Sequence, residues 1–358
     1  MPQRVIRVGI VGLGFMGRTH LRAYMAAARD GLPCEVAACC ASRDSDWNEI
    51  VSGSRSVAGN IEQAGSTEAR VDPSRVRFTT DWRSIVSDAS IDLVSVCTPT
   101  HTHADIAIAL LRAGRHTLVE KPVALSSADA VRVAEAAREA AARNVLCMPA
   151  HCMRFWTGWD WLKERVADRS LGALRALTLQ RMGSRPNWSR EYYADPAQCG
   201  GALFDLHIHD ADIVLWLLGV PDGVSSAGHV DHIVTRYHYN SPGAPAIVVA
   251  QGAWVADGFP FRMRYTAEFE HAVADWDLAR PEPLLLCRDG NAEPVPLPPV
   301  SGYDGEIRHF VRSIADLNRG MSPKLRVTPE DAVRVCRLLE MEIKSARTGN
   351  PVDASELS

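Results

Sequence analysis

The stretch Arg4–Gly17, RVIRVGIVGLGFMG, decides the fold that we expect for this chain. It begins with the apolar, β-branched run Val5–Val11, whose length suits a strand buried on both faces. The run breaks into a GxGxxG pattern, and Leu21–Ala28 then supplies mostly good helix formers. A strand, a glycine turn and a helix in this order predict a dinucleotide-binding unit.

Each glycine of the pattern has a separate physical task. Gly12 permits the tight turn, Gly14 lets the backbone approach a pyrophosphate, and Gly17 lets the helix pack closely on the strand. The pyrophosphate would lie on the unpaired N–H groups of the helix N-terminus, beside Phe15 and Met16. The alternative is a glycine-rich turn that binds no ligand, which the flanking strand and helix disfavour.

The composition is that of an ordinary soluble globular protein, with 358 residues, 46% hydrophobic residues and 23% charged residues. This length is comfortable for two domains. The net charge of −4 disfavours nucleic acid as a partner, and no apolar run is long enough to span a membrane. The first residues lack a signal-peptide pattern, and the nine cysteines form no CxxC pair. We therefore expect reduced thiols, no zinc cluster and a cytoplasmic location.

Predicted strands and helices alternate as far as residue 150. This alternation is typical of a doubly wound parallel sheet, so residues 1–150 are expected to form a Rossmann domain in an α/β protein. Residues 151–358 are expected to form an α+β domain with a mostly antiparallel, open sheet, and the last helix, 329–348, is a candidate for packing back on the Rossmann domain. The strands expected after the first one are 35–40, 91–97, 116–119, 145–148, 173–181, 224–239, 247–255, 262–270 and 283–286.

The residues after the second predicted strand select between the two nicotinamide dinucleotides. In Rossmann folds an acidic residue here binds the ribose 2′-hydroxyl of NAD. The strand 35–40 leads instead to Ser42 and Arg43, which suit the 2′-phosphate of NADP. NADP is therefore favoured, and the alternative is that Asp44 turns in to bind NAD. The polar segment 48–76 is interpreted as an insertion, to which we assign no chemistry.

Polar residues also follow later strands, at the edge where doubly wound sheets bind their ligands. Pro99 ends the strand 91–97, and the next helix begins where a nicotinamide ribose would lie. His101 and His103 are metal ligands by residue type, but a polar helix start is favoured. Lys121 leaves the next strand at its carboxyl end. The expected cofactor-binding residues are Gly12, Gly14, Phe15, Met16, Gly17, Ser42, Arg43, Thr98, Pro99, His103, Glu120, Lys121 and Pro122.

The segment 200–219 carries a second candidate site. Its apolar residues repeat at helical spacing, and a glycine and a proline end it, which predicts a helix. On a helix, Asp205, His209 and Asp212 share one face, whereas His207 points nearly opposite to Asp205. A strand would instead gather Asp205, His207 and His209 into a metal site. The helix is favoured, and no metal site is predicted.

The pair Asp205 and His209 has a use in redox chemistry. The carboxylate can orient the imidazole and stabilise its protonated form, so His209 is a candidate general base for an alcohol. Lys121 can donate a hydrogen bond to the same oxygen, with its pKa lowered by the cationic oxidised ring and by desolvation. Hydride transfer needs this arrangement because the alcohol oxygen loses its proton as the carbon loses its hydride. The alternative is a helix N-terminus decorated with aspartate, and a surface lysine.

Five motifs together make the sequence similar to the glucose–fructose oxidoreductase, inositol dehydrogenase and rhizopine-catabolism family (Gfo/Idh/MocA). They are GLGFMG at 12–17, TPTHTH at 98–103, EKP at 120–122, the GG…DxxxHD element at 200–210 and SARTGNPV at 345–352. The resemblance implies an N-terminal Rossmann domain, and a C-terminal α/β domain whose open sheet often forms the oligomer interface. It also implies a bound nicotinamide cofactor, a site between the domains and, frequently, a cis peptide before Pro122.

The resemblance also assigns roles to single residues. Lys121 and His209 would be the proton-handling pair, with Asp205 as their partner, and Arg154 matches a basic residue often found near the substrate. Trp188 is a candidate substrate contact because indole stacks on sugar faces while it donates a hydrogen bond. The expected substrate-binding residues are thus Lys121, Arg154, Trp188 and His209, with Trp156, Tyr192 and Tyr193 as further candidates. Arg154 and the four aromatic residues suit a core or an interface equally.

The favoured function is an NAD(P)-dependent oxidoreductase that transfers a hydride between nicotinamide and a secondary alcohol of a sugar, polyol or inositol-like substrate. A second hypothesis keeps the fold but makes the chain a glycosidase-like enzyme, which retains its cofactor and oxidises a sugar transiently to drive elimination. A third hypothesis is a non-catalytic NAD(P) sensor. The expected assembly is a homodimer or homotetramer formed through the C-terminal sheet.

Overall fold

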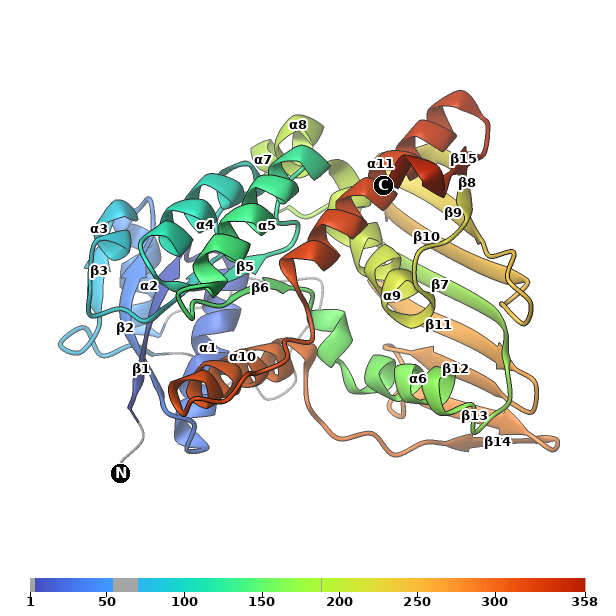
Figure 1. Cartoon of the computed structure of the whole chain (residues 1–358), viewed down its shortest axis with the longest axis horizontal. Helices are drawn as coiled ribbons and strands as arrows, with labels where there is room; N and C mark the ends of the chain where they lie inside the picture. The colour runs from blue at the N-terminus through green and yellow to red at the C-terminus, as the bar shows by residue number, and fades with distance from the viewer. Residues whose placement is uncertain (1–3, 54–69, 188, 358) are drawn as a thin grey trace. The chain divides into compact units, whose positions relative to one another are not determined.

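The computed structural model describes residues 4–53, 70–187 and 189–357, and it divides into two compact units (Figure 1). Unit 1 comprises Met1–Cys152 and Ser301–Val333, and unit 2 comprises Met153–Val300 and Arg334–Ser358. Our expected boundary at residue 150 lies two residues from the first division. The assignment of residues 301–333 to the second domain is wrong, because helix α10 (Gly302–Asn318) packs on helix α1 (Phe15–Arg29) of unit 1.

Unit 1 contains a six-stranded parallel sheet, in the order β3-β2-β1-β4-β5-β6. The strand order reverses between β1 and β4, and ligands of doubly wound sheets bind at such a reversal, beyond the carboxyl ends of the strands. The predicted Rossmann fold is therefore confirmed. The strands are β1 (Ile6–Val11), β2 (Cys34–Cys40), β3 (Arg77–Thr79), β4 (Leu93–Val96), β5 (His116–Glu120) and β6 (Cys147–Ala150).

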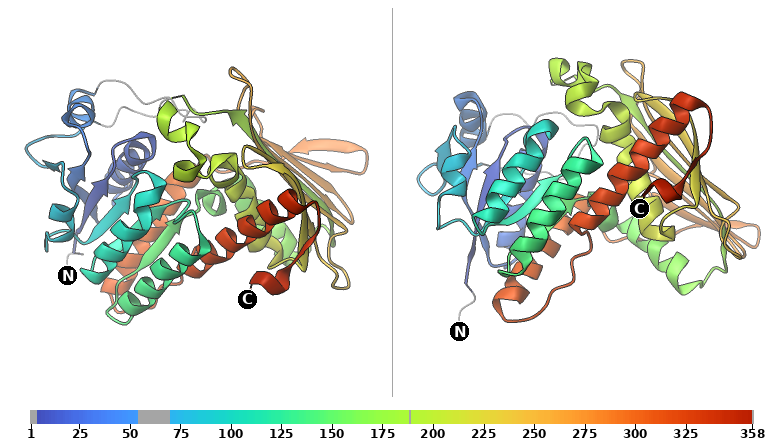
Figure 2. Two further views of the ribbon diagram at one scale, coloured as in Figure 1. Left: turned by 90° about the horizontal axis from the view of Figure 1, so that it is seen from above. Right: turned by 45° about the horizontal axis from the view of Figure 1, so that its top comes forward.

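Helices cover both faces of this sheet. Figures 1 and 2 show α4 (His103–Arg112) and α5 (Ser127–Ala141) side by side on one face, and α1 beside α10 on the other. Ser126 caps α5, since its Oγ accepts a hydrogen bond from Asp129 N at 3.2 Å. The remaining helical elements of unit 1 are α2 (Asp44–Ser52), α3 (Arg83–Val86), the 3₁₀ turn η1 (Thr100–Thr102) and the first turn of α11 (Pro329–Thr348).

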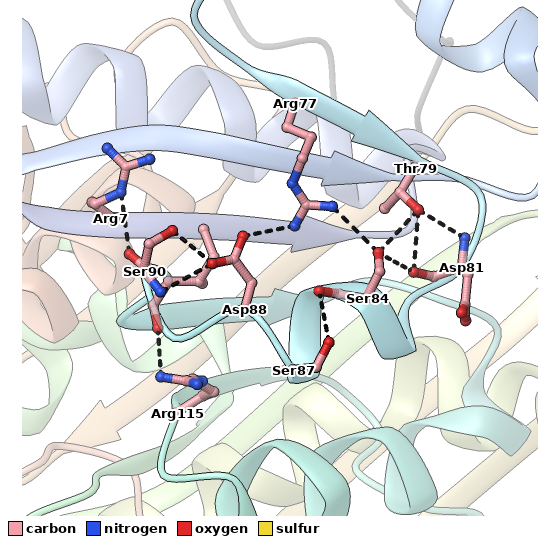
Figure 3. A network of polar contacts seen from close by, with 10 residues as sticks. Arg7, Arg77, Thr79, Asp81, Ser84, Ser87, Asp88, Ser90 and Arg115 are labelled. Carbon is pink, nitrogen blue, oxygen red and sulfur yellow. Dashed lines mark hydrogen bonds and ion pairs between the residues drawn. The ribbon is translucent and has the colours of Figure 1, made fainter.

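A polar network fixes the edge of the sheet around β3 and α3 (Figure 3). Arg77 Nη2 donates to Asp88 Oδ2 at 2.8 Å, and Arg77 Nη1 donates to Ser84 Oγ at 3.3 Å. Arg7 Nε, from the central strand β1, donates to Ser90 O at 3.1 Å. These contacts tie the short strand β3 to the turns that lead into β4, and they lie among exposed side chains.

Unit 2 contains a nine-stranded sheet, in the order β14-β13-β12-β11-β7-β10-β9-β8-β15. Strands β7 and β10 pair in parallel, and the other pairs are antiparallel, which confirms the expected type of sheet. Along β11 buried and exposed residues alternate strictly, so one face of the sheet is packed and the other carries polar side chains. The strands are β7 (Leu174–Ser184), β8 (Gly223–His229), β9 (His232–His238), β10 (Ile247–Val255), β11 (Arg262–Phe269), β12 (Val273–Asp277), β13 (Leu284–Arg288), β14 (Asn291–Pro294) and β15 (Val352–Asp353).

Two features of unit 2 differ from the expectation. The predicted strand 224–239 is a hairpin, in which β8 and β9 pair about a two-residue turn between His229 and His232. The helix expected within the segment 200–219 contains a π-helical turn, η3 (Leu203–His207), followed by the α-helix α9 (Ile208–Leu218). Both pack on the sheet strands β7 and β10. The other helical elements of unit 2 are the short turn η2 (Cys152–Phe155), α6 (Thr157–Asp168), α7 (Arg190–Ala194), α8 (Pro196–Cys199), η4 (Ala354–Leu357) and the greater part of α11.

Within the described ranges, no helix combines the length and the apolarity that a bilayer crossing needs. The nine cysteines all fall within those ranges and are free thiols, as the sequence led us to expect.

Candidate active site

The glycine turn of unit 1 leaves space at one of its three glycines. A Cβ atom at Gly12 (φ +96°) would lie 2.4 Å from Cys97 O, and one at Gly17 would lie 1.8 Å from Gly12 O. A Cβ atom at Gly14 would meet no described atom within 4 Å, and Gly14 directly precedes the first residue of α1. The turn therefore has the shape of a cradle, open where the pyrophosphate of a dinucleotide would approach the helix N-terminus. The residues of this turn fit the cofactor that the sequence predicts.

The loop after β2 presents a hydroxyl and a guanidinium to solvent. Ser42 and Arg43 are both exposed, and Arg43 precedes α2. Its Nε and Nη2 donate to the two carboxylate oxygens of Asp46 at 3.2 and 3.0 Å. Asp44 lies in the first turn of α2 and is exposed as well. The loop thus offers groups that suit a phosphate, with the guanidinium held by a neighbouring carboxylate.

The side chain of His103 connects the loops that follow β4 and β5. Its Nε2 lies 2.7 Å from Thr98 O, and its Nδ1 lies 2.8 Å from Pro122 O. His103 is the first residue of α4 and is 1% exposed, so the expected polar helix start is present. Both ring nitrogens face backbone carbonyls, which argues against a metal-ligand role. The polar atoms of His103 support the loops that carry Thr98 and Lys121, and its contact with the cofactor stays a prediction.

The EKP segment ends strand β5. The peptide bond between Lys121 and Pro122 is cis, as the resemblance implied. Lys121 N donates to Glu120 Oε2 at 3.0 Å, and Glu120 Oε1 lies 2.9 Å from His20 Nε2. Burial opposes ionisation of Glu120, but the hydrogen bond and charge of His20, followed by the charges of Lys121 and His103, lower the pKa of Glu120 overall. Glu120 therefore turns an ionised carboxylate toward His20 and the main chain of Lys121.

In unit 2 the π-helical turn sets the directions of the side chains in the DxxxHD element. Asp205 lies within η3 and is partly exposed, and His209 lies in the first turn of α9 and is 8% exposed. The segment is helical throughout, so the extended arrangement that would gather Asp205, His207 and His209 around a metal is absent from these described residues. A π-helical turn adds one residue to a regular helix and is found frequently at functional sites. A Cβ atom at Gly252 would lie 2.5 Å from His207 Cβ, so strand β10 approaches this turn closely.

Three buried ion pairs hold the helix on both sides of His209. His207 Nε2 lies 2.7 Å from Glu342 Oε2, Arg181 Nη2 donates to Asp210 Oδ1 at 2.8 Å, and Arg154 forms a bidentate pair with Asp212. These six side chains are no more than 3% exposed. Although burial lowers the pKa of His207, the charge and hydrogen bond of Glu342 raise it overall.

The expected substrate contacts have different surroundings. Arg154 Nε and Nη2 donate to Asp212 Oδ2 and Oδ1 at 2.9 and 2.7 Å, so this guanidinium already forms an ion pair with a buried carboxylate. Tyr193 packs edge-on against Trp254, in a hydrophobic cluster that also contains Leu206 of the π-helical turn. Trp188 and residues 54–69 of the segment interpreted as an insertion lie outside the described residues.

Sequence reasoning brought out Lys121, Asp205 and His209 but missed their buried neighbours. Lys121 belongs to unit 1, and Asp205 and His209 belong to unit 2, so the structure describes two separate halves of the expected site. The missed residues are His20, Arg181, Glu306 and Glu342. Each is an ionisable residue within a strand or helix that is otherwise largely apolar on its packed side, and this pattern is the signal that could have revealed them.

The comparison with known proteins follows the same division. Residues 6–148 match the sequence model of an oxidoreductase family with an NAD-binding Rossmann fold, and residues 159–256 match the GFO/IDH/MocA C-terminal domain. The chain belongs to the GFO/IDH/MocA oxidoreductase family. An NAD-binding Rossmann domain is therefore established for this family member, and the expected resemblance is confirmed.

Three curated relatives of this GFO/IDH/MocA protein carry different names. Levoglucosan dehydrogenase of Pseudarthrobacter phenanthrenivorans is 28% identical over 251 residues, which is 69% of this chain and 59% of that protein. Myo-inositol 2-dehydrogenase of Thermotoga maritima is 25% identical over 253 residues, or 66% of each chain. The 2,7-anhydro-N-acetylneuraminate hydratase of Escherichia coli is 31% identical over 151 residues, or 40% of this chain and 38% of that protein. The aligned region spans less than two thirds of each relative.

A solved structure of a levoglucosan dehydrogenase in complex with NADH and levoglucosan has a TM-score of 0.79 against this chain. The two share 20% sequence identity over 98% of this chain and 99% of the other. At this level of identity the likeness concerns the fold alone.

Proposed function

We propose that this GFO/IDH/MocA protein is an NAD(P)-dependent oxidoreductase that transfers a hydride between nicotinamide and a secondary alcohol of a sugar, polyol or inositol-like substrate. The observation that carries the proposal is the open cradle at Gly14, in a Rossmann unit whose strand β5 ends at Glu120, directly before Lys121. The names of two relatives, a levoglucosan dehydrogenase and a myo-inositol 2-dehydrogenase, support the substrate class.

In the proposed reaction the chain manages the proton of the alcohol. Bound nicotinamide supplies the hydride acceptor or donor. His209 takes the hydroxyl proton when the alcohol is oxidised and returns it in the reverse direction, and Asp205 stabilises the imidazolium. Lys121 donates a hydrogen bond to the same oxygen, which lowers the energy of the developing alkoxide. The cradle around Gly14 would hold the pyrophosphate on the backbone N–H groups at the start of α1.

The cofactor in the proposal is NADP rather than NAD. Ser42 and Arg43 are exposed at the carboxyl end of β2, and an arginine there suits the 2′-phosphate. The proposal also includes self-association through the nine-stranded sheet, whose outer face carries polar side chains such as Arg264 and Thr266. Light scattering on the purified protein tests this second part.

The test is a panel of sugars, polyols and inositols, assayed with NAD and with NADP at the absorbance of reduced nicotinamide. On the best substrate, we expect Lys121→Ala and His209→Ala each to lower kcat by about 10²–10⁴-fold, the usual contribution of a general acid or base. Exposed Lys324 and His271 give the matched controls Lys324→Ala and His271→Ala, which should retain kcat. Turnover of either site variant within a few-fold of the unsubstituted chain would refute the assignment.

The same panel decides between the proposal and a second candidate, which the hydratase relative favours. An enzyme that oxidises its substrate transiently and retains its cofactor would form product without a net change in nicotinamide absorbance. Cofactor binding with no turnover of any substrate would instead indicate a sensor. A lower KM for NADP than for NAD would support the cofactor preference, and the reverse order would refute it.

A further inference from the structure

Three ionisable side chains from distant parts of the sequence meet inside unit 1. They are His20 on α1, Glu120 at the end of β5 and Glu306 on α10, and their exposed fractions are 0%, 5% and 0%. His20 Nε2 lies 2.9 Å from Glu120 Oε1 and 3.7 Å from Glu306 Oε1. The cluster directly adjoins Lys121, yet the proposed proton chemistry does not use it.

The His20 side of the cluster is fully paired. Glu120 accepts a hydrogen bond from Lys121 N, so an ionised Glu120 needs His20 to donate through Nε2. The other ring nitrogen, His20 Nδ1, lies 3.5 Å from Cys97 Sγ. Burial, and then the negative charge of Glu120, raise the pKa of Cys97 well above its usual value, so this thiol keeps its proton. A chain of hydrogen bonds thus runs from Cys97 through His20 and Glu120 to the main chain of Lys121.

Glu306 is buried like Glu120 but differs from it in hydrogen bonding. Among the described residues, neither of its carboxyl oxygens has a hydrogen-bond partner within hydrogen-bond distance. A buried carboxylate without hydrogen bonds is far more costly than a neutral acid. Burial, and then the negative charge of Glu120, raise the pKa of Glu306 well above its usual value. Glu306 therefore carries a proton at neutral pH, while Glu120 is ionised.

We propose that His20 and Glu120 are positioning residues that hold the main chain of Lys121, and that Glu306 completes their cluster as a neutral carboxylic acid. This inference rests on the role of Lys121 in the proposed function. In this arrangement Glu120 contacts Lys121 directly, and His20, from helix α1, acts on Lys121 through Glu120. Helix α10, from a segment late in the sequence, contributes to the same arrangement.

We predict opposite effects on activity when each of the two glutamates is replaced by the isosteric glutamine. Glutamine resembles a protonated glutamic acid, so Glu306→Gln preserves the shape and charge of the cluster. Glu120→Gln replaces one of two acceptor oxygens by an NH₂ group, and that group then faces either the donor on His20 or the N–H of Lys121. The first change should be tolerated and the second should not.

The test uses the full chain with its cofactor on the best substrate of the panel. We expect Glu306→Gln to keep kcat within about three-fold, and Glu120→Gln to lower kcat at least about ten-fold, with a larger change in kcat than in KM. His20→Gln keeps a donor near Nε2 and should retain more activity than His20→Ala. This histidine pair carries the test if Glu120→Gln does not fold. Equal losses for the two glutamate variants, or equal losses for the two histidine variants, would overturn the proposal.

A readout independent of turnover separates this inference from the proposed function. We record infrared difference spectra between the unsubstituted chain and each variant. The carbonyl band of a carboxylic acid should appear in the difference spectrum of Glu306→Gln, which lacks that acid, and should cancel in that of Glu120→Gln, which retains it. If Lys121→Ala leaves turnover intact, the proposed function fails, but this band still reports the protonated Glu306. Absence of the band, or one divalent cation per chain that is lost in Glu306→Gln, would show that the cluster is not a neutral acid beside an ionised pair.

Discussion

The buried pair between Arg154 and Asp212 gives the most direct test of how unit 2 is held together. Arg154 is 3% exposed and Asp212 is 0% exposed, and two hydrogen bonds of 2.9 and 2.7 Å join them. Arg154→Met removes the guanidinium and leaves a buried carboxylate without this partner. Breaking a buried pair in this way costs about 3–5 kcal/mol. We therefore expect the free energy of unfolding to fall by that amount.

The double variant Arg154→Met with Asp212→Leu should recover much of the loss, because replacement of a whole buried pair by apolar side chains is often close to neutral. The control is Lys163→Met. Lys163 Nζ donates a single hydrogen bond to Trp216 O on α9, the helix that also carries Asp212, and Lys163 is only half-buried. Its loss should cost about 1 kcal/mol. Urea unfolding followed by circular dichroism measures all three variants.

Kinetics on the same proteins decide the role of Arg154. If its guanidinium binds the substrate rather than Asp212, Arg154→Met will raise KM while unfolding changes by less than about 1 kcal/mol. The double variant will then be no more stable than the single one. That combination would refute the structural reasoning.

Two further predictions concern unit 1. Gly14→Ala should leave the unfolding midpoint unchanged but weaken dinucleotide binding in a fluorescence titration, because its Cβ enters the open cradle. Gly17→Ala should lower the unfolding midpoint, because its Cβ would lie 1.8 Å from Gly12 O. Equal unfolding midpoints for the two variants would contradict this reasoning. Burial lowers the pKa of His116 from 6.5 to about 4, and its Nδ1 accepts a hydrogen bond from Leu146 N. Between pH 6.5 and 4 the unfolded state therefore binds more protons than the folded state. The free energy of unfolding should fall as the pH falls through this range, by about 2 kcal/mol at pH 5. His116→Asn keeps an acceptor and cannot titrate, so a variant that loses stability as steeply as the unsubstituted chain would rule out this histidine as the cause.

Local patterns were sufficient to predict the Rossmann half of the fold. The run Val5–Val11 and the glycine turn each restrict the conformation of their own residues, and the structure has β1 and α1 there. The last helix, from Pro329 to Thr348, was also predicted, because a helix stop is a property of a few adjacent residues.

Features that depend on distant residues were not predictable in this way. The apolar residues within 204–218 have the spacing of an α-helix, and nothing in that spacing indicates the π-helical turn η3. This turn packs closely against Gly252 of strand β10, which is distant in the sequence. Similarly, Arg154 is a basic residue at a suitable place for a substrate contact until Asp212 is seen beside it. Glu306 could be connected with His20 only by a structure, since most of the chain separates them.

The discontinuity of unit 1 has a consequence for how this chain is made. During synthesis the segment that ends at Cys152 emerges long before Ser301–Val333, and α1 lacks its neighbour α10 throughout that interval. The nascent Rossmann half then exposes the apolar face against which Ile307, Phe310 and Ile314 later pack. A truncated fragment that stops at Cys152 would keep that face open permanently, so expression of the cofactor-binding half requires the late segment to be joined to it.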